Sequence, residues 1–445
     1  MRPLALLLAV IAVPIWGQTA LTLENAVKLA LKQHPAMEAS DAGVKAAATK
    51  LDQARAGYLP KLNYMESWQR SNNPVFVFSS LLTQHQFTEN NFLVGPLNRP
   101  DAMNNFQSRI SVEQPIYDAG VTRKATRAAE LGREMATEES RRTSMEVIAG
   151  VARAYYGAVL AADALKVAEE AYKSAEADLA RAETIRAAGM STDADVLSIR
   201  VHLAAVKEQL IRRTNDAELA RAALNDAVGA PLNQRYDLTT PLTAVPAPAV
   251  PLEEYSKRGL LERPELRQAR LATQIGETQA SLARSSLLPT VFFQAAFEAD
   301  RQRFVDRGGA NWLGSVGMRW NIFNGGEDKA RIEEARQQTR QAQAMARRGE
   351  SAVRLQVERA YLDWKAAQER IEVTSATVAA AEESLRITQN RYANGLATVT
   401  DLLRTETALL ETRTRKLAAV HDQRLAAAML ELAAGTLNAS SDVLK

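Results

Sequence analysis

The segment Pro115-Ile116-Tyr117-Asp118-Ala119-Gly120 recurs as Asn321-Ile322-Phe323-Asn324-Gly325-Gly326, and this recurrence decides the fold. The closing glycines are 206 residues apart, since 326 − 120 = 206. The same offset relates four further pairs: Tyr155 with Tyr361, Gly189 with Gly395, Asp195 with Asp401, and Gly229 with Gly435. One register held over this length predicts two structural repeats in one chain.

Two proline pairs show where the repeats differ in length. Pro35 and Pro60 are 25 residues apart, as are Pro264 and Pro289. The offset between the two pairs is 264 − 35 = 229 residues, which exceeds the later offset of 206 by 23. The first repeat therefore carries 23 extra residues between Pro60 and Gly120, and we expect them to form a loop.

The repeats are predicted to span residues 21–237 and 252–437, followed by a short C-terminal tail at 438–445. The linker between them, 238–251, contains four prolines, so it should be extended and non-helical. At the N-terminus, Met1-Arg2-Pro3 and the apolar run from Leu4 to Trp16 predict a secretory signal over residues 1–20. Cleavage is expected near Gly17 or Ala20, and the protein is expected to be exported.

Composition excludes several classes of protein. The chain of 445 residues has no cysteine, which removes disulfides, thiolate metal sites, a cysteine nucleophile and a lipid-bearing cysteine. Its net charge is only +3, with Lys and Arg alternating with Asp and Glu, so we expect solvated helix faces and no nucleic-acid partner. The signal run is too short to span a bilayer, and no later stretch approaches the ~20 apolar residues of a membrane helix.

Each repeat is predicted to open with a helix, at 23–57 and at 252–287, with Thr22 as the N-cap of the first. Pro60 and Pro289 end these helices, and apolar residues then recur with a period of two. Four such runs predict strands of about ten residues, long enough for a tilted membrane strand. The runs are Leu62 to Trp68, Phe106 to Ile116, Val291 to Phe297, and Trp312 to Ile322.

A soluble β-sandwich with one buried face would produce the same local alternation. The context favours membrane strands, because Trp and Tyr lie toward the strand ends, as an interfacial girdle requires. The 23 extra residues fall in the first strand–strand loop, between Ser71 and Asn105. Longer loops are typical of the exposed side of a membrane barrel.

The longest predicted elements are two helical hairpins. In the first, apolar residues from Ala154 to Ala182 follow a 3,4 spacing typical of a coiled-coil seam. Gly189 ends this helix of about 100 Å, and a return helix runs to Gly229; Gly395 marks the second hairpin. Since each return helix is shorter than its partner, we expect the opening helix to stack end to end with it, as part of a helical tube continuous with the strands.

Four strands cannot close into a barrel, and open sheet edges are not tolerated in lipid. The protein must therefore form oligomers if the strands cross a membrane. Two copies would give eight strands and three would give twelve. Only twelve strands are expected to leave a lumen instead of a packed core.

Four features of the chain resemble the TolC-type outer-membrane efflux protein family. They are the opening Leu21-Thr22-Leu23-Glu24-Asn25-Ala26-Val27 through His34-Pro35, the helix exit Tyr58-Leu59-Pro60, the strand exit Gln114 to Gly120, and two Gly-x5-Asp hairpins. The resemblance covers nearly the whole mature chain. It implies a mainly α fold in which α-helical hairpins join a trimeric twelve-stranded β-barrel, and partnership with a periplasmic adaptor and an inner-membrane transporter.

An enzyme is not expected. The four histidines are scattered and no common catalytic or phosphate-binding motif occurs, so we predict neither a cofactor nor a metal site. His34, before Pro35, is predicted to end a helix. By its resemblance to the family, the chain is expected to be a passive exit duct for efflux or type I secretion in the outer membrane, with its helical part in the periplasm. The alternative function is a periplasmic coiled-coil adaptor or scaffold, although such a protein typically needs one hairpin and compact β domains.

The hairpin tips are the candidate adaptor-docking sites by resemblance to the family. The tip residues are Arg186, Gly189, Met190, Arg391, Gly395 and Leu396. Any helical hairpin favours glycine at this position, so glycine alone decides nothing. The paired Gly-x5-Asp motif favours a functional role, and we expect Met190 and Leu396 to be exposed apolar residues.

Resemblance also places a gate near the tips. It implies that Asp401 lies in a constriction ring, where three-fold symmetry would bring three carboxylates together, and that Tyr392 and Asp195 hold neighbouring hairpins closed. The sequence departs from the family at two positions: Arg404 stands where some members have a second acid, and Ala397 where some have an arginine. Arg404 is predicted either to neutralise Asp401 or to form an ordinary surface pair with it.

Overall fold

The computed structural model describes residues 19–246 and 250–445. The chain forms two compact units, and we describe each by itself. The sheet unit comprises residues 43–137 and 268–347. The hairpin unit comprises the described residues up to 42, together with 138–267 and 348–445.

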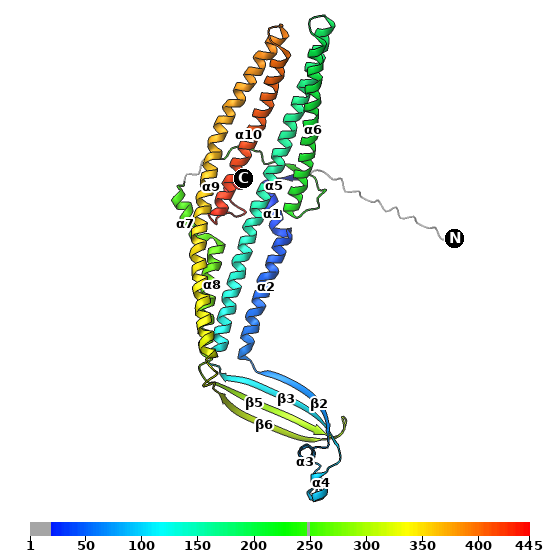
Figure 1. The fold of residues 1–445 in the computed structure, drawn as a ribbon, viewed down its shortest axis with the longest axis vertical. Coiled ribbons are helices and arrows are strands. Elements are labelled where there is room, and N and C mark those ends of the chain that lie inside the picture. The colour runs from blue at the N-terminus through cyan, green and yellow to red at the C-terminus, as the bar shows by residue number, and fades with distance from the viewer. Residues whose placement is uncertain (1–18, 247–249) are drawn as a thin grey trace, which may run out of the picture. The chain divides into compact units, whose positions relative to one another are not determined.

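The sheet unit contains the four predicted strands (Figure 1). They are β2 (Lys61–Ser71), β3 (Met103–Tyr117), β5 (Thr290–Arg301) and β6 (Gly309–Arg319). The strands pair antiparallel in the order β2-β3-β5-β6, which leaves β2 and β6 as the two edges. The last strand was expected to reach Ile322 but ends at Arg319, after which the Trp320 indole N–H donates to the carbonyl of Leu287.

The strand register separates an apolar face from a polar face. Tyr64, Ile110, Phe297 and Trp312 lie directly opposite one another in one row across all four strands. All four side chains are exposed, Trp312 to 82%. The adjacent row, on the other face, consists of Met65, Arg109, Glu298 and Asn311. The sheet therefore presents an uncovered apolar face and a largely polar one.

The first strand–strand connection, predicted as a loop, contains short helices. These are α3 (Pro74–Thr83), the 3₁₀ turn η2 (Glu89–Phe92) and α4 (Val94–Asn98). Asn73 caps α3, because its side-chain oxygen accepts hydrogen bonds from the backbone N–H groups of Val75 and Phe76, and Pro74 suits the first helical position. The expectation of a plain loop was therefore wrong.

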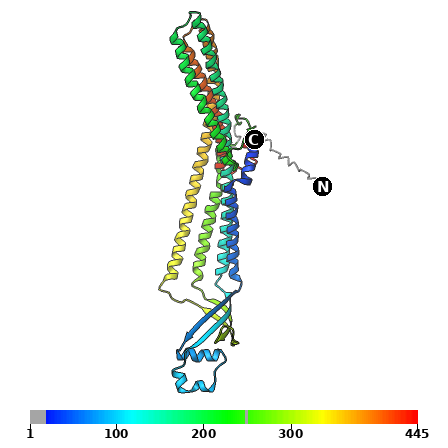
Figure 2. The ribbon, with the colours of Figure 1, turned by 90° about the vertical axis from the view of Figure 1, so that its right-hand side faces the viewer.

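The long helices match the predicted hairpins (Figures 1 and 2). α5 (Val121–Ala187) and α9 (Glu327–Ala393) each have 67 residues, and the return helices are α6 (Asp193–Val228) and α10 (Val399–Ala433). The equal lengths support the internal repeat. α5 also contains one stretch with the length and composition to cross a membrane, contrary to expectation, but half of that stretch is buried within the protein.

The opening helices are broken where the sequence analysis expected continuity. α1 (Leu23–Gln33) and α2 (Pro35–Arg55) are separated at His34, and α7 (Leu252–Glu262) and α8 (Pro264–Ser285) at Arg263. A proline disfavours the helical conformation of the residue before it, and His34 accordingly adopts φ −68° and ψ 131°. His34 thus ends α1, as predicted, and Thr22 caps its start by accepting from Asn25 N–H.

Two glycines bring the return helices against these breaks. Gly229 ends α6 with φ 75°, and a Cβ atom there would lie 3.1 Å from the Cα of His34. At Gly435, just past α10, a Cβ atom would lie 2.8 Å from the backbone nitrogen of Arg263. Each return helix therefore ends at the junction between two opening helices, as end-to-end stacking predicts.

A compact core in the hairpin unit fixes the start of the chain. Tyr155 is fully buried; its hydroxyl donates to the carbonyl of Leu21 over 2.8 Å and accepts from the N–H of Thr240 over 2.9 Å. Beside it, β1 (Thr19–Leu21) pairs in parallel with β4 (Tyr236–Leu238), which the sequence analysis did not predict. Residues 1–18 of the predicted signal lie outside the described residues.

Candidate gate and docking residues at the hairpin tips

Each hairpin tip is a glycine turn with a local structural cause. Gly189 and Gly395 have φ of 77° and 72°, a left-handed conformation that favours glycine. The N–H of Met190 donates to the carbonyl of Ile185, and that of Leu396 to Arg391, which closes the helix end in the manner of a Schellman motif. Met190 and Leu396 are 75% and 67% exposed, so their predicted exposure is confirmed.

The aspartates of the Gly-x5-Asp motif begin the return helices. At the second tip, the Thr398 hydroxyl donates to the Asp401 carboxylate over 2.7 Å, and the Asp401 N–H donates back to that hydroxyl over 3.2 Å. Thr192 and Asp195 form the same reciprocal capping box at the first tip. These hydrogen bonds lower the pKa of both aspartates. Thr192 and Thr398 were not singled out from the sequence, although the Thr-x2-Asp spacing is a capping signal.

The charge of Arg404 is one of several influences that lower the pKa of Asp401. The hydrogen bonds from Thr398 come first among the causes that lower the pKa of Asp401, and the charges of Arg391 and then Arg404 add to them. Arg391 also donates to the carbonyl of Leu396 over 3.2 Å, which ties it to the tip. At the other tip, Arg186 pairs with Asp193.

Tyr392 is part of the core that joins the two hairpins. It packs with Ala182, Val196, Ile199, Val399 and Leu402, and it is only 8% exposed. Within the described chain its buried hydroxyl has no hydrogen-bond partner. Burial raises the pKa of Tyr392, and the charges of Asp195 and Asp178 raise it further. The structure thus brings Tyr392 near Asp195 without a hydrogen bond between them in one protomer.

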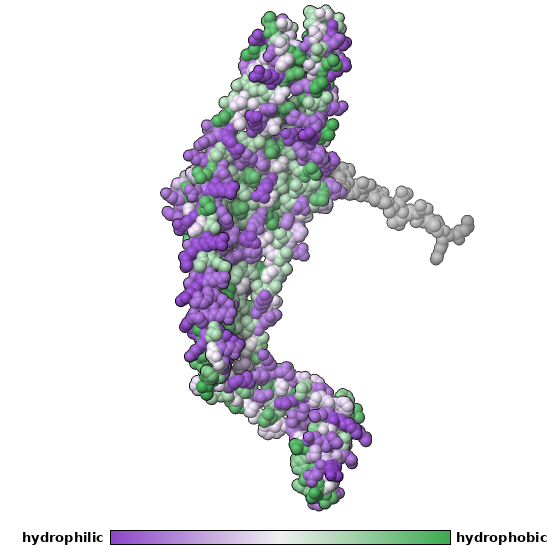
Figure 3. Space-filling model, in the orientation of Figure 1, coloured by the Kyte–Doolittle hydropathy of each residue, from purple (hydrophilic) through white to green (hydrophobic). Residues whose placement is uncertain are grey.

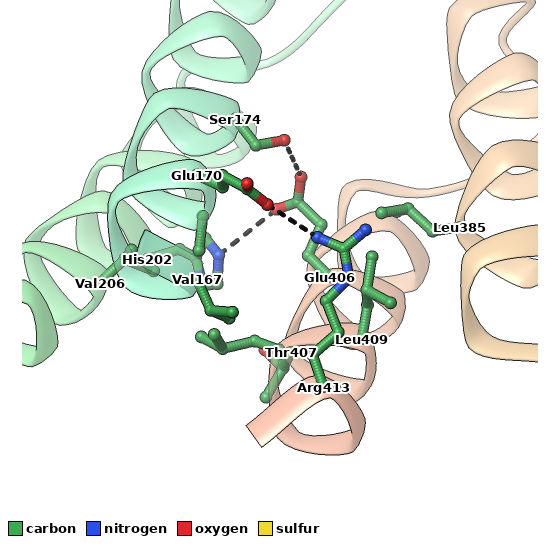
Figure 4. Close-up of a pocket in the computed structure, with 12 residues that line it drawn as sticks. Val167, Glu170, Ser174, His202, Val206, Leu385, Glu406, Thr407, Leu409 and Arg413 are labelled. Atoms are coloured by element: carbon green, nitrogen blue, oxygen red, sulfur yellow. Dashed lines mark hydrogen bonds and ion pairs between the residues drawn. The ribbon is translucent and has the colours of Figure 1, made fainter. Parts of the chain in front are cut away.

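A second polar cluster lies between the hairpins, around Glu406 on α10 (Figure 4). Its carboxylate is 3.3 Å from the His202 ring nitrogen and accepts from the Ser174 hydroxyl, also at 3.3 Å. Asp178, on α5, is almost fully buried beside it. Burial and the neighbouring Glu406 raise the pKa of Asp178 to about 7. Burial opposes ionisation of Glu406, but hydrogen bonds with His202 and Asp178 outweigh this and lower its pKa.

The surroundings of this cluster supply several charges. Arg181 pairs with Asp178 over 3.3 Å. Arg413 on α10 bridges Glu170 of α5 and Glu382 of α9, at 3.1 and 2.8 Å. A cavity of about 110 Å³ is lined by Glu406, Arg413 and Leu385, among others (Figure 4). The arrangement places two buried carboxyl groups, Asp178 of the first hairpin and Glu406 of the second, beside each other.

Sequence reasoning missed this cluster because it does not follow the repeat. The position equivalent to Asp178 is Ser384, and the position equivalent to Glu406 is Arg200, since both offsets are 206. His202 had been noted only as one of four scattered histidines. The only signal in the sequence was the position of Asp178 and Glu406 among the apolar residues that form the helix seams. Such a signal is weak without the structure.

Comparison with known proteins identifies the family. The profile of the outer membrane efflux protein family matches residues 26–230 and 256–436, one segment for each repeat. Protein CyaE of Bordetella pertussis is 25% identical over 95% of this chain and 85% of its own, and alkaline protease secretion protein AprF of Pseudomonas aeruginosa is 26% identical over 94% and 85%. The CmeC outer membrane channel of Campylobacter jejuni has the same fold, with a TM-score of 0.79, 17% identity, and coverage of 99% and 96%.

The chain belongs to the outer membrane efflux protein family. It is an outer-membrane exit duct of an efflux or type I secretion system, with its helical part in the periplasm. The alternative of a periplasmic adaptor or scaffold is thereby set aside. The family also explains why the chain combines two hairpins with membrane-type strands.

Replacing Asp178 tests whether its raised pKa affects stability. Because the pKa of Asp178 rises from 3.8 to about 7 on folding, the folded protein keeps a proton that the unfolded chain has released. The contribution of Asp178 to the free energy of unfolding is therefore highest below pH ~4. It falls by at most about 4 kcal/mol between pH ~4 and pH ~7, at about 1.4 kcal/mol per pKa unit, and is constant above pH ~7. Asp178→Asn stays neutral, so it should lose this part of the pH dependence.

The measurement is the melting temperature of the helices, followed by circular dichroism at pH 4 and pH 8. The wild type should melt at a lower temperature at pH 8 than Asp178→Asn does, and the two should converge at pH 4. Asp216→Asn removes an exposed acid from the same hairpin and should behave like the wild type. Identical pH profiles for all three proteins would contradict the assignment.

Proposed function

We propose that three copies of this chain form a passive channel without catalytic activity, whose twelve strands cross the outer membrane and whose hairpin tips form a periplasmic gate. The observation that carries the proposal is the sheet with two unpaired edges and an uncovered apolar face. Lipid provides no partner for the N–H and C=O groups of an edge strand. Pairing β2 of one copy with β6 of the next satisfies both edges at once.

The two faces of the sheet indicate how it lies in the barrel. The row of Tyr64, Ile110, Phe297 and Trp312 suits lipid, since each side chain is large, apolar and exposed. The opposite face carries Arg109 and Glu298, whose charges suit a water-filled lumen. Three copies supply twelve strands, enough for an open lumen, whereas eight strands enclose a space that side chains fill.

Arginine substitutions on adjacent residues of β6 test this orientation. Val316 is on the apolar face and 68% exposed, so Val316→Arg should place a charge in lipid and impair assembly by about 2–4 kcal/mol. Ser315→Arg, one residue earlier on the polar face, should be tolerated. The measurement is the yield of heat-modifiable trimers in outer-membrane fractions. Equal yields for both variants would refute the barrel orientation.

The tips are proposed to dock with a periplasmic adaptor that connects the channel to an inner-membrane transporter. Met190 and Leu396 are large apolar side chains that project into water at the ends of the hairpins. Single exposed apolar residues are common, but two at equivalent turns form a matched contact for a partner. The neighbouring Arg186 and Arg391 already make contacts within the tips.

The double variant Met190→Asp with Leu396→Asp should abolish adaptor docking while leaving trimers intact. Both side chains are exposed, so the substitutions remove little packing within the protomer. The measurement is cross-linking to the adaptor in cells, with trimer migration as the control for folding. Normal cross-linking in the double variant would show that docking occurs elsewhere.

The gate is proposed to involve Tyr392, Asp195 and Asp401, with Arg404 tuning the charge of Asp401. The buried hydroxyl of Tyr392 has no partner within the described protomer, so a neighbouring hairpin in the trimer can supply one. One carboxylate oxygen of Asp401 accepts hydrogen bonds from Thr398, yet the side chain remains at the surface, where its charge can face the three-fold axis. A functional test must therefore separate the gate from the capping box.

Asp401→Gln makes that separation, because glutamine at this position keeps the capping box but removes the charge. Single-channel recording should show weaker cation block and lower cation selectivity, with an unchanged melting temperature. Tyr392→Phe should raise the resting conductance without destabilising the protomer, since its hydroxyl has no partner there. Unchanged currents in both variants would place the constriction elsewhere.

A further inference from the structure

The insert between β2 and β3 has no counterpart in the second repeat. It contains α3, η2 and α4, whereas β5 and β6 are joined by a short turn from Gln302 to Gly308. Phe78, Phe87 and Phe92 stack edge to face, at 4.8 and 5.0 Å between ring centres, and give the insert a small core of its own. The insert is thus a folded segment with its own small core.

α3 is bound to the polar face of the sheet. The Gln84 side chain, just past α3, is almost fully buried and donates to the carbonyl of Asn104 over 3.0 Å and to the Asn105 side chain over 2.9 Å. On β6, the Asn311 side chain donates to the carbonyl of Thr83 over 3.2 Å. Asn105 and Asn311 both belong to the polar face by their register.

Gly309 shows that the sheet is shaped to receive α3. A Cβ atom at this position would overlap the carbonyl oxygen of Thr83, so any larger residue would displace the end of the helix. The glycine begins β6, the edge strand farthest from the start of α3. The helix end is therefore held against one sheet edge by both shape and hydrogen bonds.

α3 crosses the sheet from one edge to the other. It starts three residues after β2 ends, and its last turn is bound to β6. Its ten residues span about 15 Å, close to the ~14 Å across four strands spaced by ~4.8 Å. If β2 of one copy pairs with β6 of the next, the start of one α3 faces the end of its neighbour.

Apolar side chains of the insert are left uncovered within the protomer (Figure 3). Val75, at the start of α3, is 77% exposed, and Leu82, near its end, is 48% exposed. Leu93 and Val94 are also exposed on the same insert. Lipid does not cover Val75 and Leu82 in the proposed barrel, because α3 lies on the polar face of the sheet.

We propose that the inserts of neighbouring copies bind one another head to tail, with Leu82 of one copy against Val75 of the next, and form an apolar collar around the lumen at this end of the barrel. The occupant of the uncovered face is thus a second copy of the chain. The inference rests on the proposed trimer. The path of α3 supports this inference, because the helix runs between the two sheet edges that pair in the proposed trimer.

Cysteine pairs test the collar cleanly, because the chain contains no cysteine. The double variant Val75→Cys with Leu82→Cys should form dimers and trimers on non-reducing gels after mild oxidation or a short bifunctional maleimide. The matched control pairs Val75→Cys with Ser79→Cys, an exposed position near the middle of α3, and should give several-fold less cross-linking.

Heat-modifiable migration of the unmodified protein separates failure of the collar from failure of the trimer. Intact trimers that cross-link no better through positions 75 and 82 than through the control pair would overturn the collar alone. Cross-linking to a different protein at these positions would also overturn it. Absence of trimers in the wild type would overturn both proposals.

Discussion

Two unpaired sheet edges govern what this protein can be. Among the residues that the structure describes, β2 and β6 each leave a row of backbone N–H and C=O groups without partners, next to a face of exposed aromatic and aliphatic side chains. In water such a sheet would aggregate, and in lipid its edges would lack hydrogen bonds. Pairing between copies satisfies the edges and places the apolar face in lipid. Membrane insertion and oligomerisation are therefore one requirement.

The helical part follows from breaks at defined residues. Pro35 and Pro264 interrupt the opening helices, and Gly229 and Gly435 allow the return helices to end against those interruptions. In each repeat, the return helix and the interrupted opening helices accompany one uninterrupted helix of 67 residues. The chain uses proline to stop a helix and glycine to let another approach, in the same order in both repeats.

Most of this architecture could be predicted from the sequence, because each weak sequence pattern occurs in both repeats. Hairpin tips, strand positions and the N-cap at Thr22 were all found by pattern. The opening helices were drawn as continuous because helical periodicity continues across His34 and Arg263, although the restriction that Pro35 imposes had already marked His34 as a helix end. The short helices after Asn73 were missed because the insert was treated only as extra length. The acid cluster of Asp178 and Glu406 was missed because neither residue has an acidic counterpart in the other repeat.

The residues that break the repeat are the ones that carry asymmetry between the hairpins. Asp195 and Asp401 share a local role, since each closes a capping box, so their recurrence has a structural cause before any function is assigned. Tyr392, Glu406 and His202 have no such local cause. They lie buried or partly buried where α9 and α10 meet the first hairpin, and each carries a polar group whose environment depends on the other hairpin. Movement of one hairpin relative to the other would therefore change the hydration of these groups first, while the capping boxes at the tips would remain intact.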